Sequence, residues 1–246
     1  MDRAPAINLP PVVIGLALAF IGVHGLRQVL TEEADTWVLL AFAFISLRYG
    51  ELASLLPGGT AALVWSPVTY AFLHADLVHL IVNLVWMASF GGALARRFGS
   101  GRFLLLSLVS AVGGAGLHYV LHAGEEGLMI GASGAVSGMM AATACFAFSP
   151  GGPLAGNRSP KAYRIAAEPL RVVFTRSRAL GFVLVWFAVN LLFGLGGGLI
   201  PGVSGPIAWE AHIGGFVAGL LCFPLLDPIP REPPNDEHLA SDEPAA

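Results

Sequence analysis

The stretch GASGAVSGMM, residues 131–140, places three glycines and two serines in the first eight residues of an apolar run. Gly134 and Gly138 are four residues apart, so in a helix they form one small face against which a second helix can pack closely. Close packing is one interpretation of this stretch. The other is chemical, because a helix N-terminus presents unpaired N–H groups and the positive end of the helix dipole. A serine there, Ser133, can attack a carbonyl while its backbone N–H helps to hold the oxyanion.

The rest of the chain is also apolar. Of its 246 residues, 55% are hydrophobic and 12% are charged, whereas a soluble domain carries about 25% charged residues. This composition predicts a polytopic membrane protein of one domain, without a basic tract that could bind nucleic acid. Cys145 and Cys222 lie in apolar runs, which favours buried thiols over a disulfide or a zinc site.

Six segments are long and apolar enough to span a bilayer as helices, which takes about 20 residues each. They are roughly 11–30, 76–95, 103–122, 132–149, 179–197 and 207–226. The run at 37–47 is too short to span and predicts an interfacial or re-entrant helix in a long first loop. We therefore expect an all-α, six-helix membrane domain over 11–226. A short cytoplasmic N-terminus over 1–10 precedes it, and a disordered acidic cytoplasmic tail over 227–246 follows it.

Lys and Arg are distributed unevenly around these segments. With the N-terminus inside, all of them except Arg27 and Arg48 fall on the cytoplasmic side. The positive-inside rule therefore predicts that both termini are cytoplasmic. The N-terminus shows neither a cleavable signal nor an Arg-rich, Ser-rich transit peptide. This favours a bacterial inner membrane over a mitochondrion.

This orientation brings four polar side chains to one depth below the outer surface. His79 and Asn83, in the second segment, are four residues apart and share a helix face. Ser133 lies near the outer end of the fourth segment, and His212 lies in the first turns of the sixth. Polar residues at such depth usually face protein or water. By themselves, His79 and Asn83 are better interpreted as interhelical hydrogen-bonding residues, each worth about 1 kcal/mol.

The sixth segment contains WEAHIGGFVAG, residues 209–219, which repeats the small-residue spacing at Gly215 and Gly219. If its neighbour is the glycine-lined fourth segment, His212 can reach Ser133, which is the arrangement of an activated nucleophile. Glu210 lies about 200° from His212 around the helix and points elsewhere. We interpret it as an interface or loop-anchoring residue.

The other histidines carry no predicted chemistry. His118 and His122 share a face near the outer end of the third segment, and two histidines at this spacing can bind a metal. No third ligand with suitable spacing accompanies them, so we interpret them as interface residues and expect no metal site. His24 is a lone polar residue in the first segment, and His238 lies in the tail.

Three motifs occur in order on the second, fourth and sixth segments: HADLVHLIVN, GASG and AHIGG. Together they resemble the rhomboid intramembrane serine proteases, and the resemblance covers about residues 10–226. It implies a six-helix rhomboid-like bundle with a long first extracytoplasmic loop. It also implies that Ser133 is the nucleophile and His212 the general base of a Ser/His dyad.

The resemblance implies supporting roles as well. His79 and Asn83 match the side chains of the oxyanion hole, which the Ser133 N–H completes. His74 matches the first histidine of the HxxxxHxxxN motif and has a more structural part. Gly131 and Gly134 match the glycines that flank the serine.

Three positions depart from the family pattern. Ser137 stands where an aromatic residue, usually Tyr, often packs against the general base. The first loop reads Trp65-Ser66 instead of Trp-Arg, and Ala95 replaces a common Glu. These departures concern how His212 is held, loop anchoring and substrate range.

The resemblance implies an endopeptidase that cleaves single-span membrane proteins within the lipid bilayer, near the outer leaflet, without a metal or cofactor. The oligomeric state stays open. The alternative is a catalytically inactive rhomboid-like protein that binds membrane clients; loss of the serine or the histidine would indicate it, and both are present. A small transporter would predict internal repeats, which the two halves lack. The glycine-rich stretch 194–205 is either a mobile cap over the site or a simple connector.

Overall fold

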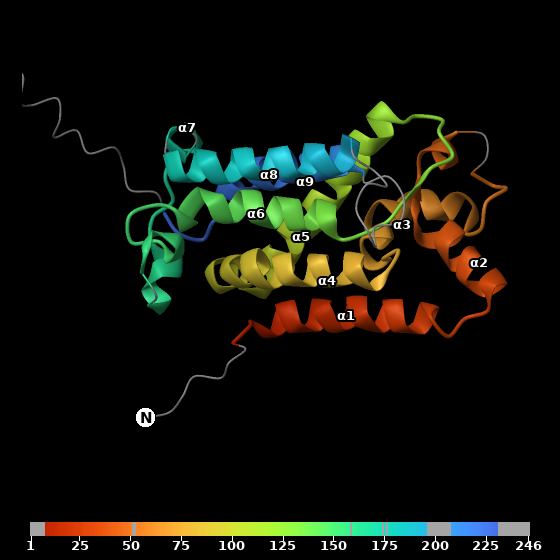
Figure 1. Cartoon of the computed structure of the whole chain (residues 1–246), viewed down its shortest axis with the longest axis horizontal. Helices are drawn as coiled ribbons and strands as arrows, with labels where there is room; N and C mark the ends of the chain where they lie inside the picture. The colour runs from red at the N-terminus through yellow and green to blue at the C-terminus, as the bar shows by residue number, and fades with distance from the viewer. Residues whose placement is uncertain are drawn as a thin grey trace, which may run out of the picture.

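The computed structural model describes residues 8–50, 53–157, 159–173, 175, 177–195 and 208–230, and it is mostly helical. The long helices lie side by side, with α2 and α3 gathered at one end of the molecule (Figure 1). The long helices are α1 (Pro11–Arg27), α4 (Leu77–Trp86), α5 (Gly92–Leu121), α6 (Ser133–Ala147), α8 (Ser177–Leu195) and α9 (Trp209–Leu226). Each of the six predicted segments contains helix.

The second and third predicted segments form one stretch, Leu77–Leu121, interrupted in two ways. Met87–Gly91, η4, is a π-helical turn between α4 and α5. Within α5, Gly99 has φ 73° and ψ 172°, a backbone conformation that strongly favours glycine. The chain reverses at Gly99, so the stretch consists of two helices and not one long rod.

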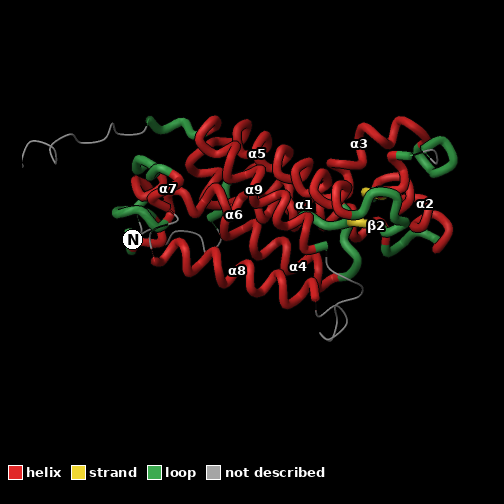
Figure 2. Tube along the Cα trace, turned by 90° about the horizontal axis from the view of Figure 1, so that it is seen from above, coloured by secondary structure: helices red, strands yellow, loops and turns green. Residues whose placement is uncertain are grey.

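Helix α6 lies at the centre of the bundle. Every one of its residues after Ser133 is buried. Figure 2 shows α6 and α9 between α5 on one side and α4 and α8 on the other. Helix α9 packs most extensively against α5 and α6.

The α6–α9 contact is made between backbones. A β-carbon on Gly215 would overlap the carbonyl oxygen of Gly134, and one on Gly219 would overlap the backbone of Gly138. The predicted interpretation of these glycines as close-packing positions is therefore confirmed. The contact brings the start of α9 next to the start of α6.

The helix predicted at 37–47 in the first loop has other bounds in the structure. Helix α2 runs from Glu32 to Phe42, and Thr31 caps its start by accepting a hydrogen bond from the Ala34 N–H. Residues Phe44–Ile45 form the short strand β1, which pairs antiparallel with β2, Leu128–Met129. This pairing joins the first loop to the segment that leads into α6.

The end of α2 is held by side chains from later in the chain. A helix leaves its last carbonyls without intrahelical partners. Here the carbonyl of Leu40 accepts from Arg48, that of Ala41 accepts from Trp65 at 2.9 Å, and that of Phe42 accepts from Thr69 at 2.7 Å. Trp65 and Thr69 belong to α3 (Ala62–Thr69), which continues into the 3-10 turn η3 (Tyr70–Phe72). These donors stop α2 at Phe42, five residues before the predicted end.

The opposite end of the bundle is joined by a buried ion pair. Arg97 contacts Asp227 at 2.8 Å and also donates to the carbonyls of Tyr163 and Ile165. Tyr163 lies in the 3-10 helix η6 (Pro160–Arg164), near η5 (Pro153–Ala155) and α7 (Leu170–Val173). Asp227, assigned to the acidic tail from sequence, is thus anchored to the domain. Residues 231–246 of that tail lie outside the described residues.

Two described helical stretches are long and apolar enough to cross a membrane, Leu77–Leu121 and Trp209–Leu226. Helices α1 and α6, and residues Arg178–Leu192 of α8, are apolar but shorter. Large apolar side chains are exposed along the outer faces of several of these helices, among them Leu18, Val85, Leu105, Leu192 and Leu225. An exposed apolar surface this extensive is typical of contact with lipid or a partner.

We predict that Gly215→Ala destabilises the protein by about 1–3 kcal/mol, because the added methyl group must push α9 away from α6. The matched control is Gly116→Ala on α5, where a β-carbon would meet no atom within 4 Å. That change should be neutral, or stabilising by about 0.5–1 kcal/mol. Thermal melting in detergent measures both. Equal melting temperatures for the two variants would contradict close backbone packing at Gly215.

Candidate active site

Ser133 is the first residue of α6, and Ala132 precedes it as the N-cap. Its backbone N–H therefore has no partner within the helix. The approach to the helix is made by Gly131, whose φ is +118° and whose N–H donates to the carbonyl of Tyr70 at 3.0 Å. Ser133 is only partly buried, so its hydroxyl is accessible.

Ser133 and His212 are in direct contact. The Ser133 Oγ lies 2.7 Å from the Nε2 of His212, which sits in the first turns of α9. The two residues are 79 positions apart, and the glycine contacts between α6 and α9 bring them together. The predicted pairing of these side chains is therefore present in the fold.

Asn190 on α8 completes a chain of three polar groups. Its Oδ1 accepts a hydrogen bond from the Nδ1 of His212, and its Nδ2 donates to the carbonyl of Trp186 at 2.8 Å. The second bond sets the amide so that oxygen, not nitrogen, faces the histidine. The proton of neutral His212 is therefore on Nδ1. The Nε2 of His212 carries a lone pair and accepts the hydrogen bond from the Ser133 hydroxyl.

Sequence reasoning did not identify Asn190. A signal was present, because an asparagine inside the apolar run VWFAVNLLF is costly in a membrane helix unless it has a partner. Ser137, where the family pattern has an aromatic residue, donates to the Ser133 carbonyl at 2.7 Å. Its side chain contributes no ring, and Asn190 is the residue that holds His212.

His79 and Asn83 lie on α4 and line the same cavity as Ser133, His212 and Asn190. Asp76 caps α4 by accepting from the His79 N–H at 2.7 Å. Asn83 is buried, and its Nδ2 donates to the His79 carbonyl at 3.0 Å. An amide nitrogen carries two protons, so Asn83 keeps one for a further acceptor.

Gly131 makes room for His79. A β-carbon on Gly131 would lie 2.5 Å from the Nε2 of His79, and its positive φ independently disfavours any side chain. Gly134 is also closely packed, since its β-carbon would lie 2.9 Å from the Tyr70 hydroxyl. Both glycines are thus needed by the geometry around Ser133.

His74 supports this region from the turn before α4. It is fully buried, and its ring lies 5.5 Å from that of Phe20 and 5.2 Å from that of His79. Burial lowers the pKa of His74 to about 3, so the ring is neutral and acts by packing. Its carbonyl accepts from Arg27 at 2.8 Å, and Arg27 in turn pairs with Asp35.

The cavity has a volume of about 570 Å³ and is bounded by α4, α6, α8, α9 and the loop at 127–131. Its walls are mainly apolar, and its polar groups converge near Ser133. A serine hydroxyl that donates to a histidine, held in turn by an amide oxygen, is suited to nucleophilic acyl transfer. The stretch 194–205, predicted to be either a cap over the site or a simple connector, lies almost wholly outside the described residues.

Glu210 does not take part in this arrangement, as predicted. It anchors α9 to α5 through a 2.6 Å contact with the Nδ1 of His118 and a 3.4 Å contact with the Nε2 of His122. Glu210 is thus a third potential ligand beside His118 and His122, which the sequence analysis did not find. The third group comes from a helix 88 positions further along the chain than His122, where sequence spacing cannot reveal it.

Comparison with known proteins agrees with the family resemblance of the three motifs. A family model described as Rhomboid domain matches residues 61–227. The chain is 29% identical over 212 residues to a protein named Rhomboid protease GlpG from Serratia proteamaculans (strain 568), covering 86% of this chain and 61% of that one. It is 29% identical over 159 residues to a protein of the same name from Yersinia pestis (strain Pestoides F), covering 64% of this chain and 46% of the relative. The chain thus spans less than two thirds of the length of these curated relatives.

The site geometry predicts that a fluorophosphonate probe labels Ser133, because His212 can accept the hydroxyl proton during attack on phosphorus. Ser133→Ala should abolish labelling and His212→Ala should reduce it at least tenfold, a conservative bound given that base catalysis contributes roughly 10²–10⁴-fold. Ser137→Ala is the control, since it removes a nearby hydroxyl that does not contact His212. In-gel fluorescence and peptide mapping read the result. Labelling that persists in Ser133→Ala would rule out Ser133 as the reactive serine.

Proposed function

The chain belongs to the rhomboid family, and we propose that it is an intramembrane serine endopeptidase that cleaves membrane proteins near the outer leaflet. The observation that carries the proposal is the 2.7 Å contact between Ser133 and His212. It occurs beside a cavity, at the start of two helices that meet through glycines. The relatives named Rhomboid protease support the same activity.

In the proposed reaction, His212 accepts the Ser133 hydroxyl proton through Nε2 as Oγ attacks the substrate carbonyl. The tetrahedral intermediate collapses when His212 returns the proton to the leaving amine. Water, deprotonated by His212, then attacks the acyl-enzyme, and His212 returns that proton to the Ser133 Oγ as the acyl C–Oγ bond breaks. Asn190 accepts from Nδ1 throughout, so it keeps the ring oriented and stabilises the imidazolium that forms twice in the cycle.

We assign the oxyanion hole to three donors. They are the side chains of His79 and Asn83 and the backbone N–H of Ser133. The first two reach the cavity from α4, and the third is unpaired at the first position of α6. Donors held in place before the reaction stabilise developing charge more than water does. The catalytic residues in this proposal are Ser133, His212, His79 and Asn83.

Six membrane spans with both termini in the cytoplasm complete the proposal. The spans are α1, α4 with the start of α5, the rest of α5, α6, α8 and α9. Exposed apolar side chains on these helices support lipid contact, and the buried α6 supports a bundle around a central helix. The placement of Lys and Arg supports the orientation. We further propose residues 11–226 as the membrane domain, in a bacterial inner membrane, with 1–10 and 227–246 as cytoplasmic segments.

Single-span membrane proteins are the proposed substrates. A transmembrane helix hides its carbonyls in hydrogen bonds, so it must unwind before Ser133 can attack. We expect small residues and helix breakers near the outer end of the substrate span. A cavity of about 570 Å³ lies within the range of roughly 300–1,000 Å³ typical of ligand sites and admits a short unwound segment.

We predict that the purified protein in liposomes cleaves a model single-span substrate with a helix-breaking outer end, and that Ser133→Ala and His212→Ala do not. Loss of the base alone should reduce the rate by about 10²–10⁴-fold. Product mass spectrometry locates the cut. Equal cleavage by all three proteins would indicate a contaminant and leave the dyad unsupported.

A failure to cleave has two separable causes. If wild type does not cut but Ser133 accepts the fluorophosphonate, the site is active and the substrate was wrong. If the protein does not cleave the substrate and Ser133 is not labelled, the client-binding function replaces the protease function as the proposal. Co-purification of the uncut single-span protein with wild type would then support that alternative.

Asn190 provides a prediction specific to this chain. We expect Asn190→Leu, which keeps the size but loses the acceptor, to lower kcat by up to about a hundredfold with little change in KM, because the imidazole is no longer oriented. Asn190→Asp keeps an acceptor and should retain more activity than Asn190→Leu. Steady-state cleavage and melting temperature are measured together. Equal activity of the two variants at equal stability would exclude a positioning role.

A further inference from the structure

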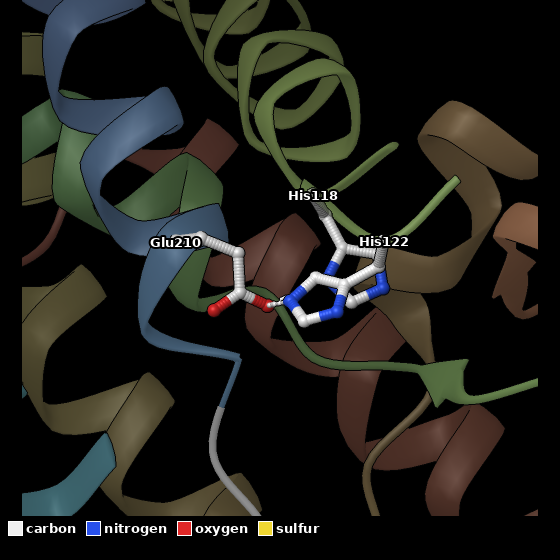
Figure 3. A group of neighbouring side chains, drawn as sticks. All are labelled: His118, His122 and Glu210. Carbon is white, nitrogen blue, oxygen red and sulfur yellow. Dashed lines mark hydrogen bonds and ion pairs between the residues drawn. The ribbon is translucent and has the colours of Figure 1, made fainter. Parts of the chain in front are cut away.

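A second polar cluster lies at the opposite side of α9 from the dyad. It consists of His118 and His122 at the end of α5 and Glu210 in the first turn of α9. Figure 3 shows the Glu210 carboxylate directed at the two imidazole rings. None of these groups has a part in the proposed reaction.

The three side chains converge on one point. Their ligand atoms all lie within 4.8 Å of one another. One oxygen, Oε1 of Glu210, is 2.6 Å from the Nδ1 of His118 and 3.4 Å from the Nε2 of His122. Ligands bonded to one tetrahedral zinc ion at about 2.0–2.2 Å are about 3.3–3.6 Å apart. The contact with His122 already fits this separation, and the shorter contact with His118 would have to lengthen. A small outward movement of the carboxylate would open the space for an ion.

The hydrogen bond at the far nitrogen of His122 orients its ring toward this point. The Nδ1 of His122 lies 2.8 Å from a carboxylate oxygen of Glu125. The other ring nitrogen, Nε2, therefore faces the Glu210 carboxylate at 3.4 Å. A metal ion between these two atoms would be bound by both.

The surroundings favour a cation at this point. His118 and His122 lie at the C-terminal end of α5, where the helix dipole attracts positive charge. Glu125, bonded to His122, supplies the outer carboxylate that often orients a metal-bound histidine. The His122 side chain is 33% exposed, so an ion can enter without unfolding the bundle.

We infer that His118, His122 and Glu210 form a binding site for Zn²⁺, with water as the fourth ligand. Two imidazoles and one carboxylate are a preferred zinc donor set, and imidazole nitrogen disfavours Mg²⁺ or Ca²⁺. The ion would replace the direct contact between the Nδ1 of His118 and the Glu210 carboxylate. It would tie the end of α5 to the start of α9, two residues before His212, and so brace the helix that carries the general base.

The test is zinc titration of the full chain, purified without a histidine tag, by isothermal titration calorimetry and by thermal melting. We expect one Zn²⁺ per chain and a melting temperature that rises with zinc concentration. His122→Ala, at a partly exposed position, should weaken binding at least tenfold. Glu125→Gln should weaken it about tenfold by loosening His122, as outer carboxylates do elsewhere. Glu126→Gln, an exposed neighbour, is the matched control and should change nothing.

The catalytic histidines could bind zinc themselves, so His79→Ala is included. Under the proposal this variant binds as wild type does. Zinc binding lost in His79→Ala but kept in His122→Ala would overturn the proposal and assign the ion to the active site. Absence of binding in wild type would also overturn it. Melting temperatures without zinc show whether each variant folds, independently of any protease assay.

Discussion

Backbone-to-backbone contact between α6 and α9 is the constraint on which the rest of this structure depends. Gly134 and Gly138 meet Gly215 and Gly219 without side chains between them. In a bilayer the hydrophobic effect does not drive helices together, so dispersion contacts at close range must do so. The same contact carries His212 to Ser133. The close-packing interpretation of GASGAVSG is confirmed, and the proposed chemistry at Ser133 would use the same set of small residues.

An apolar bundle also favours partners for its buried polar groups, since desolvation without a partner costs several kcal/mol. This requirement explains the position of several side chains. Asn190 joins Trp186 to His212, Tyr70 donates to the Ala111 carbonyl at 2.9 Å, and Arg97 pairs with Asp227. These bonds lie at both ends of the bundle and beside the cavity. They give the helices one register, which a purely apolar interface would leave less defined.

The structure explains two of the three departures from the family pattern. Ser137 supplies no ring, and an amide from α8 holds the imidazole instead. Ser66 supplies no guanidinium, and the buried Arg48 donates to carbonyls of the first loop. Both functions, orientation of the base and anchoring of the loop, are thus carried by residues at other positions. Nothing in the structure explains the change of the common Glu to Ala95.

The sequence alone determined the features that depend on residues close together in the chain. Apolar length predicted the helices. Four-residue spacing predicted that His79 and Asn83 share a helix face and that the repeated glycines line another. The three motifs, in order on three segments, resemble one family, and this resemblance predicted that Ser133 and His212 are in contact. The tertiary structure alone decided which distant groups complete a hydrogen bond: Asn190 at His212, Glu210 at His118, and Arg48, Trp65 and Thr69 at the end of α2. Side-chain hydrogen bonds form between atoms about 3 Å apart, whatever their separation in sequence, so periodicity and spacing could not reveal these partners.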